Sequence, residues 1–245
     1  MNTETAQALY SKLEGKRYQY VDRARQCSKL TLPYIMTEEG FGAHSRLETP
    51  FQGIGARGVN NLASKLLLAL LPPNAPFFRL NIDSHGLEQE GAPPELISEI
   101  EKSLQQVEES VMDEISRETY RTVLHEALKH LIISGNALIY LPDEGGMRVF
   151  HLDRYTVERD PMGNIGWKVW QEINGNLIPD SEGFYALDKN PFIPLRFSRI
   201  DGEDYGRGYV EEYLGDLQSL ESLQRALVEG SAAAAKVLFL VNPNG

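Results

Sequence analysis

The chain has 245 residues, a formal net charge of −11 and a single cysteine, Cys27. This length is enough for one large domain or two small domains with a real core. The acidic balance argues against strong sequence-independent binding of nucleic acid, which relies on lysine and arginine to neutralise phosphates. It does not exclude a surface past which nucleic acid slides, because like charges repel.

A single cysteine excludes an intrachain disulfide and indicates a reducing, cytoplasmic setting. The N-terminus, which begins Met1-Asn2-Thr3-Glu4, has neither the basic nor the apolar region of a signal peptide. The longest apolar runs, such as residues 66–71, are far below the ~20 residues that a membrane-spanning helix needs. We therefore expect no contact with a membrane.

The first 134 residues are predicted to be mainly helical, because apolar residues recur three or four positions apart. The expected helices cover residues 3–30, residues 50–71, and two consecutive helices within 94–134. Thr49 as N-cap, Pro50 at the first helical position and Gln52 as capping-box partner predict the start of the second helix. Residues 77–82 alternate enough to predict a strand. Gly135 predicts the end of the second helix within 94–134, since glycine accepts the left-handed conformation.

The apolar period then changes to that of short strands, separated by turns rich in glycine, asparagine and proline. The predicted strands cover residues 137–141, 147–152, 156–159, 165–173 and 195–200. Residues 177–194 contain three prolines and are predicted to be irregular. Helices followed by a β meander over 137–200 and then by one long helix predict an α+β fold.

The chain is organised around its last part, in which an acidic loop at residues 201–207 precedes a long helix at residues 208–236. The helix carries an apolar stripe of Val210, Tyr213, Leu214, Leu217, Leu220, Leu223, Leu227 and Val228. It would extend roughly 43 Å, which is too long for most compact cores. Small residues at 230–235 would allow another backbone to approach closely. This pattern predicts assembly with other subunits, and the apolar strand at 237–241 predicts that the chain is a fragment.

Two motifs resemble sites for small ligands. Gly53–Gly58 matches G-x-G-x-x-G, but the dinucleotide fingerprint needs a strand before it and a βαβ unit around it. Close packing of the first helical turns explains these glycines better. His125 and His130 lie five positions apart, about 140° around a helix, so they do not match the spacing of two histidines that share a zinc ion.

The acidic loop contains Asp201, Glu203 and Asp204, and carboxylate oxygens are ligands for Ca²⁺ or Mg²⁺. Their spacing differs from that of an EF-hand, so we expect Arg207 or a basic residue of a neighbouring subunit to relieve their repulsion. No serine nucleophile or acid–base pair stands out, and no catalytic, cofactor or metal site is predicted. The alternative left open is a metal- or nucleotide-dependent enzyme that uses residues 201–204 or Gly53–Gly58.

The whole chain resembles the N-terminal half of the portal, or head–tail connector, proteins of short-tailed phages. The strongest block begins with Asp201-Gly202-Glu203-Asp204-Tyr205-Gly206-Arg207 and continues to Gln224. Further blocks are residues 55–66, residues 120–129, residues 135–142, Arg159-Asp160 with Gly163-Asn164, and Asn242-Pro243. The segment between Trp170 and Pro191 is shorter than this family usually has. The chain also stops before the clip, the returning stem helix, the channel loop and the crown.

The resemblance implies a non-enzymatic dodecameric ring at one vertex of the capsid, without cofactors, through which double-stranded DNA is packaged and ejected. The implied partners are terminase, scaffold and capsid proteins and a tail adaptor, and the implied location is the virion. Residues 1–200 would form the peripheral wing. Residues 201–245 would form a hinge loop, the first stem helix and the start of a clip-like strand. The residues expected at subunit interfaces are Tyr205, Arg207, Glu211, Leu217, Leu220 and Ala233.

Overall fold

A computed structural model describes residues 6–236, apart from 39, 41, 43, 74, 83–92, 118, 143–144, 160–164, 174–175 and 178–190. The helices are α1 (Ala6–Lys29), α2 (Ile54–Leu70), α4 (Pro94–Arg117), α5 (Tyr120–Ser134), the 3-10 helix η1 (Leu152–Arg154), α6 (Tyr209–Glu212) and α7 (Leu214–Ala234). The strands are β1 (Asn136–Tyr140), β2 (Arg148–Phe150), β3 (Tyr155–Arg159), β4 (Ile165–Ile173), β5 (Asn176–Leu177) and β6 (Phe192–Arg196). The architecture is α+β, as predicted.

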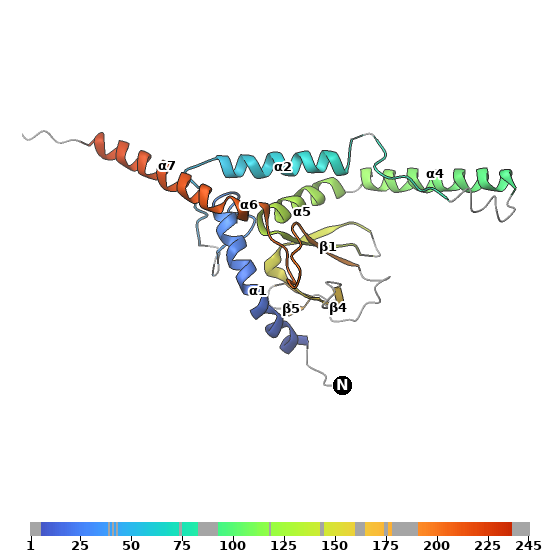
Figure 1. Cartoon of the computed structure of the whole chain (residues 1–245), viewed down its shortest axis with the longest axis horizontal. Coiled ribbons are helices and arrows are strands. Elements are labelled where there is room, and N and C mark those ends of the chain that lie inside the picture. The colour runs from blue at the N-terminus through green and yellow to red at the C-terminus, as the bar shows by residue number, and fades with distance from the viewer. Residues whose placement is uncertain are drawn as a thin grey trace, which may run out of the picture.

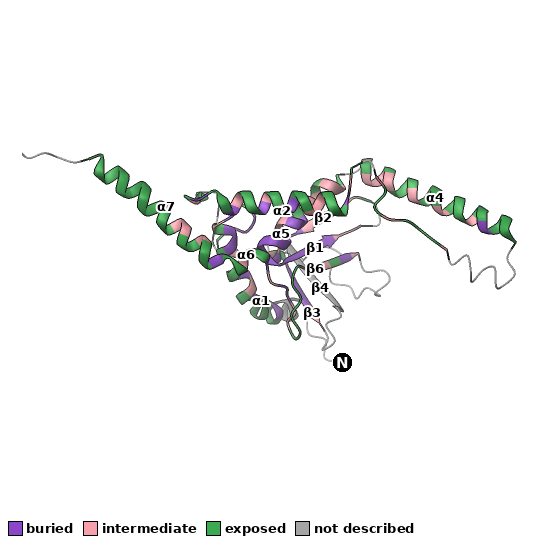
Figure 2. Ribbon diagram, turned by 45° about the horizontal axis from the view of Figure 1, so that its top comes forward, coloured by how far each residue is buried: buried purple, intermediate pink, exposed green. Residues whose placement is uncertain are grey.

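Helix α5 lies at the centre of the molecule and contacts α1, α2, α6 and β1. Its second half is buried on almost every side, because its buried residues point all around the helix axis: Ala127, Leu128, His130, Leu131, Ile132, Ile133 and Ser134. In Figure 2 the buried residues gather around α5 and β1, while α7 and α4 are mostly exposed. The core therefore occupies the middle of the molecule, and the two exposed helices extend from it.

Two small antiparallel sheets complete the body, with strand orders β2-β1-β6 and β3-β4-β5. Helix α1 is tied to this part by Arg17, a buried side chain whose Nη1 donates to the carbonyl oxygens of Leu152, Asp153 and Tyr155 at 2.8–3.1 Å. Figure 1 shows α7 and α4 leaving the body in opposite directions. In the described ranges no helix is both long enough and apolar enough to cross a membrane.

The predicted start of the second helix is wrong by four residues. Helix α2 begins at Ile54 because the Gln52 side chain is already engaged: its Oε1 accepts from the Gly55 amide at 2.9 Å and its Nε2 donates to Leu30 O at 2.6 Å. Gln52 thus bonds to the first turn of the helix, and the N-cap position is Gly53 instead of Thr49. By contrast, Gly135 ends α5 in the left-handed conformation with φ 74°, which confirms that prediction.

Two strand predictions are corrected as well. Residues 77–82 form no strand; the segment runs beside α4, where the Leu80 amide donates to the Glu108 carboxylate. Strand β6 begins at Phe192 and ends at Arg196, three to four residues earlier than predicted. Among the described strands it pairs only with β1, at the edge of its sheet, a place where Pro194 is tolerated.

Candidate functional site: the joint between the body and the long helix

The acidic loop leads into α6 through a segment that we call the joint, Glu203–Glu211. Asn136, the first residue of β1, binds the joint twice: its Nδ2 donates to Gly206 O at 2.8 Å, and its Oδ1 accepts from the Gly206 amide at 2.7 Å. Ser198 forms an isolated β-bridge with Arg207 on the other side. The joint is therefore paired with the backbone of the body like an additional short strand.

Three glycines allow the backbone of the joint to lie directly against the backbone at the end of α5. A Cβ on Gly208 would lie 2.4 Å from Ile133 O, and a Cβ on Gly206 would lie 2.6 Å from Gly135 O. A Cβ on Gly135 would lie 2.3 Å from the carbonyl carbon of Arg207. Since these neighbours are backbone atoms, at the end of α5 for Gly206 and Gly208 and in the joint for Gly135, they cannot move aside as a flexible side chain can. Only glycine fits at these three contacts.

Tyr205 anchors the joint in the core. It is 2% exposed, its hydroxyl oxygen accepts from the Val157 amide at 3.0 Å, and its ring packs against Tyr20 with 5.2 Å between ring centres. Asp204 is held beside it, because its Oδ1 accepts from the Arg159 amide at 3.2 Å and its carbonyl oxygen accepts from Arg159 Nε at 2.8 Å. These bonds connect the joint to β3.

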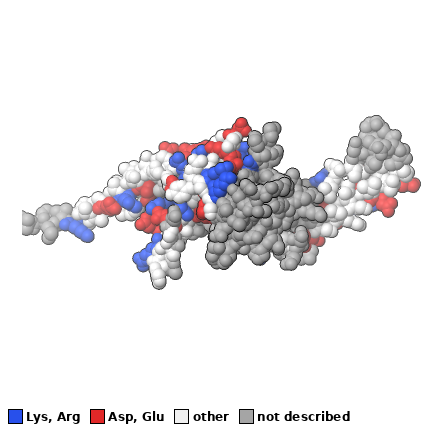
Figure 3. Space-filling model, turned by 90° about the horizontal axis from the view of Figure 1, so that it is seen from below, with Lys and Arg blue, Asp and Glu red and all other residues white. Residues whose placement is uncertain are grey.

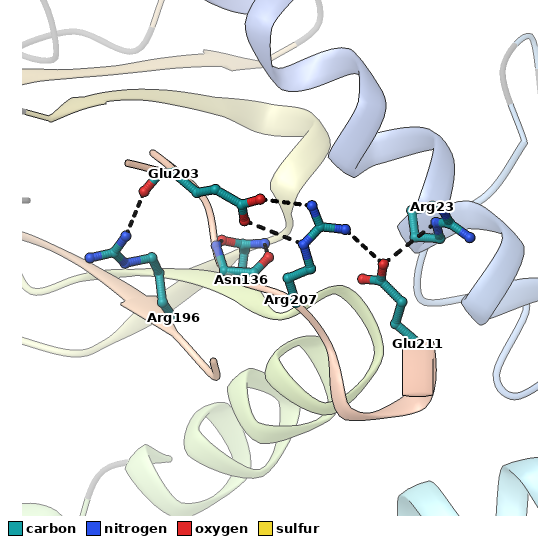
Figure 4. Close-up of polar contacts among 7 residues, drawn as sticks. Arg23, Asn136, Arg196, Glu203, Arg207 and Glu211 are labelled. Atoms are coloured by element: carbon teal, nitrogen blue, oxygen red, sulfur yellow. Dashed lines mark hydrogen bonds and ion pairs between the residues drawn. The ribbon is translucent and has the colours of Figure 1, made fainter. Parts of the chain in front are cut away.

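Arg207 neutralises the acidic residues on both of its sides (Figure 4). Its Nη2 and Nε bind the two carboxylate oxygens of Glu203 at 2.7 and 3.3 Å, and its Nη1 binds Glu211 Oε1 at 2.9 Å. Arg23 on α1 adds a second ion pair to Glu211 at 3.6 Å. The hydrogen bonds that Arg207 donates to Glu203 and Glu211 raise its pKa further above the ordinary value. The prediction that Arg207 relieves the repulsion in this loop is confirmed for Glu203, whereas Asp204 is bound by Arg159.

The two small-ligand motifs have other contacts in the structure. In the described part of the chain no three His, Cys, Asp or Glu side chains gather as metal ligands. His125 Nε2 lies 3.3 Å from Ser64 Oγ, whereas the buried His130 faces Glu126 at 3.7 Å. In the Gly53–Gly58 motif, a Cβ on Gly55 would lie 2.5 Å from Leu30 O, so close packing explains that glycine. No strand precedes the motif in the described ranges.

Beyond the joint, an apolar groove of about 510 Å³ separates α2 from α6 and α7. Ile54 and Leu62 line it from α2, and Leu217 and Leu220 line it from α7. Farther along α7, Leu223 and Leu227 are 59% and 61% exposed, with Val228 beside them at 55%. This helix therefore presents an apolar row that its own chain does not cover in the described ranges.

The structure divides the six residues predicted at subunit interfaces into three groups. Tyr205, Arg207 and Glu211 meet in the joint, where they bind their own chain. Leu217 and Leu220 line the groove, and Ala233 is exposed near the end of α7. Contact of any of the six with another subunit stays a prediction.

Sequence reasoning missed a contact between α7 and the segment that precedes α2. The Glu221 carboxylate accepts from the Phe51 amide at 3.0 Å and from the Gln52 amide at 3.2 Å. Arg225, one turn farther on, places its guanidinium 5.2 Å from the centre of the Phe51 ring. The partners are 169 and 170 positions apart, so no local pattern signals this pairing.

Comparison with known proteins gives the class to which this fold and joint belong. The chain belongs to the family described as bacteriophage head to tail connecting protein, whose model matches residues 3–171 and 163–244. It is 35% identical to the portal protein of Escherichia phage T7 over 293 aligned residues, covering 98% of this chain and 54% of that protein. It is also 35% identical to the portal protein of Enterobacteria phage T3, in an alignment that covers 100% of this chain and 55% of that protein. It is 30% identical to the portal protein of Enterobacteria phage SP6, in an alignment that covers 96% of this chain and 55% of that protein.

The chain thus spans about half the length of the relatives that it matches. The T7 alignment is 293 residues long, more than the 245 residues of this chain, so the relative carries additional residues inside the matched region. The family match is also divided into two parts that meet at residues 163–171. This division adjoins the stretch between Trp170 and Pro191, which the sequence predicted to be shortened.

Proposed function

We propose that this chain supplies the wing and the first stem helix of a portal subunit. In this proposal the body, up to residue 200, is the wing, the joint connects it to the stem, and α7 is the stem helix. The observation that supports it most is the family membership, together with relatives named portal proteins that match at 35% identity. The projection of α7 from the body, with an apolar row left exposed, is what a helix that packs against other subunits requires (Figure 1).

In the proposed assembly, copies of the chain form a closed ring of twelve at one vertex of the capsid. A ring interface is heterologous, so one surface of a subunit contacts a different surface of the next. The groove lined by Leu217 and Leu220 and the exposed row of Leu223 and Leu227 are two such surfaces on one helix. We propose that both are covered in the ring.

Double-stranded DNA would pass through the centre of this ring during packaging and ejection. The net charge of −11 favours passage of DNA through the ring over adhesion of DNA to its wall, because negative groups repeated around a channel repel phosphates. On the face seen in Figure 3, acidic and basic side chains are mixed, without the continuous basic surface that tight DNA binding needs. Terminase, scaffold and capsid proteins and a tail adaptor are the proposed partners, and the virion is the proposed location.

The proposal is tested by measuring the mass of the assembled protein. Sedimentation velocity on the purified protein at rising concentration should show a discrete species of about twelve subunits. A protein that stays monomeric at high concentration would contradict the proposed ring. Titration with short duplex DNA should show weak binding that salt abolishes, whereas tight binding would contradict the passage mechanism.

A further inference from the structure

The start of the long helix is fixed to the body. Gly206 is paired with Asn136, Tyr205 is buried, and Gly208 lies in backbone contact with Ile133. The short helix α6 continues this attachment, because it packs against α5 and buries Val210. The sequence predicted a hinge in the acidic loop. These contacts indicate instead that the joint and α6 move together with the body.

The helix is interrupted immediately after α6. Tyr213 has φ −108° and ψ 9°, away from helical values, and separates α6 from α7. Its ring packs against Tyr209, with 3.0 Å between the two hydroxyl oxygens, and it remains 44% exposed. Gly215 follows in open space, with nothing within 4 Å of where its Cβ would lie. Leu214, which follows Tyr213, is 5% exposed and packs in the core, so the part of α7 that can bend away from the body begins at Gly215.

Glu221 connects α7 to the body about two turns beyond this break. Its carboxylate accepts two backbone hydrogen bonds, from Phe51 and Gln52, in the segment that leads into α2. Gln52 in turn binds Leu30 O at the end of α1 and the Gly55 amide at the start of α2. One carboxylate therefore links α7 to a point where two helices of the body meet.

The groove leaves room for α7 to move. Its 510 Å³ lie between α2 and α7, and its lining includes Ile54 and Leu62 on one wall and Leu217 and Leu220 on the other. Bringing these walls together would remove apolar surface from water, which is favourable at roughly 25 cal/mol per Å². In the structure the walls stay apart while Glu221 is bound to Phe51 and Gln52.

We propose that α7 pivots at Gly215, just beyond the break at Tyr213, and that Glu221 acts as a latch that holds α7 at the angle that keeps the groove open. Release of the latch lets α7 close toward α2. The angle between the wing and the stem is then set by one carboxylate and two backbone amides, while the joint stays rigid. The pivot is a property of a single chain and does not depend on ring formation.

Single-molecule fluorescence energy transfer tests the latch within one chain. Donor and acceptor dyes are attached to Ala69→Cys on α2 and Ala232→Cys on α7, both of which are exposed. Cys27 does not compete for the dyes, because it is fully buried and burial raises its thiol pKa to about 12. Labelled chains are diluted one in a hundred into unlabelled protein, so that an assembly contains at most one labelled chain.

Parent protein should give one narrow distance distribution. Glu221→Ala should broaden it or shift it by several ångströms to shorter distances, and Glu229→Ala, on an exposed part of the same helix, should leave it unchanged. A Glu221→Ala distribution identical to the parent would overturn the proposal. If that variant fails to fold, Glu221→Gln, which keeps one acceptor oxygen, serves for the same comparison.

Tyr205→Phe separates the two possible bending points. It removes the hydroxyl that accepts from Val157, so it should lower the melting temperature but leave the distance distribution narrow. If Tyr205→Phe broadens the distribution and Glu221→Ala does not, the bending point lies in the joint and the proposal is wrong. Neither outcome depends on whether the protein forms a ring, so failure of the latch and failure of the portal assignment are distinguishable.

Discussion

The sharpest prediction concerns Gly208, where the joint touches the end of α5. A methyl group added there would lie 2.4 Å from Ile133 O, 2.8 Å from Ile133 C and 3.0 Å from Gly135 N. All three are backbone atoms held by α5 and its cap. Gly208 has φ −78° and ψ 150°, values that alanine adopts freely, so the Gly208→Ala penalty is purely steric.

The size of the effect follows from the contact distances. Relieving three contacts of 3.0 Å or less requires the joint to shift away from α5, which strains the pairing of Gly206 with Asn136. Overpacking of this kind costs about 1–3 kcal/mol. At roughly 2–4 °C per kcal/mol for a chain of this size, Gly208→Ala should lower the melting temperature by about 2–12 °C.

Urea unfolding followed by circular dichroism measures this loss against a matched control. Gly215→Ala places the same methyl group in α7, where nothing lies within 4 Å, and should stabilise the helix by up to about 1 kcal/mol. The two variants therefore shift the unfolding midpoint in opposite directions. A Gly208→Ala midpoint equal to that of the parent would refute the argument that backbone contact locks the joint.

Three further predictions test other parts of the structure. Arg207→Ala leaves the carboxylates of Glu203 and Glu211 without their main partner and should lower the free energy of unfolding, measured in urea, by about 1 kcal/mol. The loss is modest because Arg207 is partly exposed to solvent. Arg207→Lys should recover part of this stability. Leu220→Asp places a charge in the apolar groove and should reduce the assembled mass in sedimentation, whereas unchanged assembly would mean that this face meets no subunit. Burial lowers the pKa of His151 to about 4 from an unfolded value near 6.5, so protons favour the unfolded chain. Stability should fall by up to roughly 3 kcal/mol as pH drops from about 6.5 to 4, and His151→Phe should flatten this part of the pH profile.

Local patterns predicted the parts of the fold that depend on neighbours in sequence. Apolar spacing located α1, α2, α4 and α5 within a few residues, and Gly135 marked the end of α5. Arg207 could be paired with the acidic loop because its two partners lie four positions away on either side. In each case the physical signal was contained in one short segment.

The remaining features depend on contacts between distant segments. Gln52 sits in a typical capping position, yet its side chain binds the carbonyl oxygen of Leu30, 22 positions away, and α2 begins only at Ile54. Residues 77–82 have strand-like alternation, but α4 provides their neighbour and none of the described strands pairs with them. The latch from Glu221 to Phe51 joins segments 170 positions apart, which no periodicity reveals.

Electron microscopy of the purified protein at high concentration tests the central claim most directly. We expect closed rings with twelvefold symmetry, in which α7 lies nearest the central axis and the body lies at the periphery. Particles that are only monomers, or rings in which α7 lies on the outer rim, would contradict the assignment of α7 as the stem of a portal.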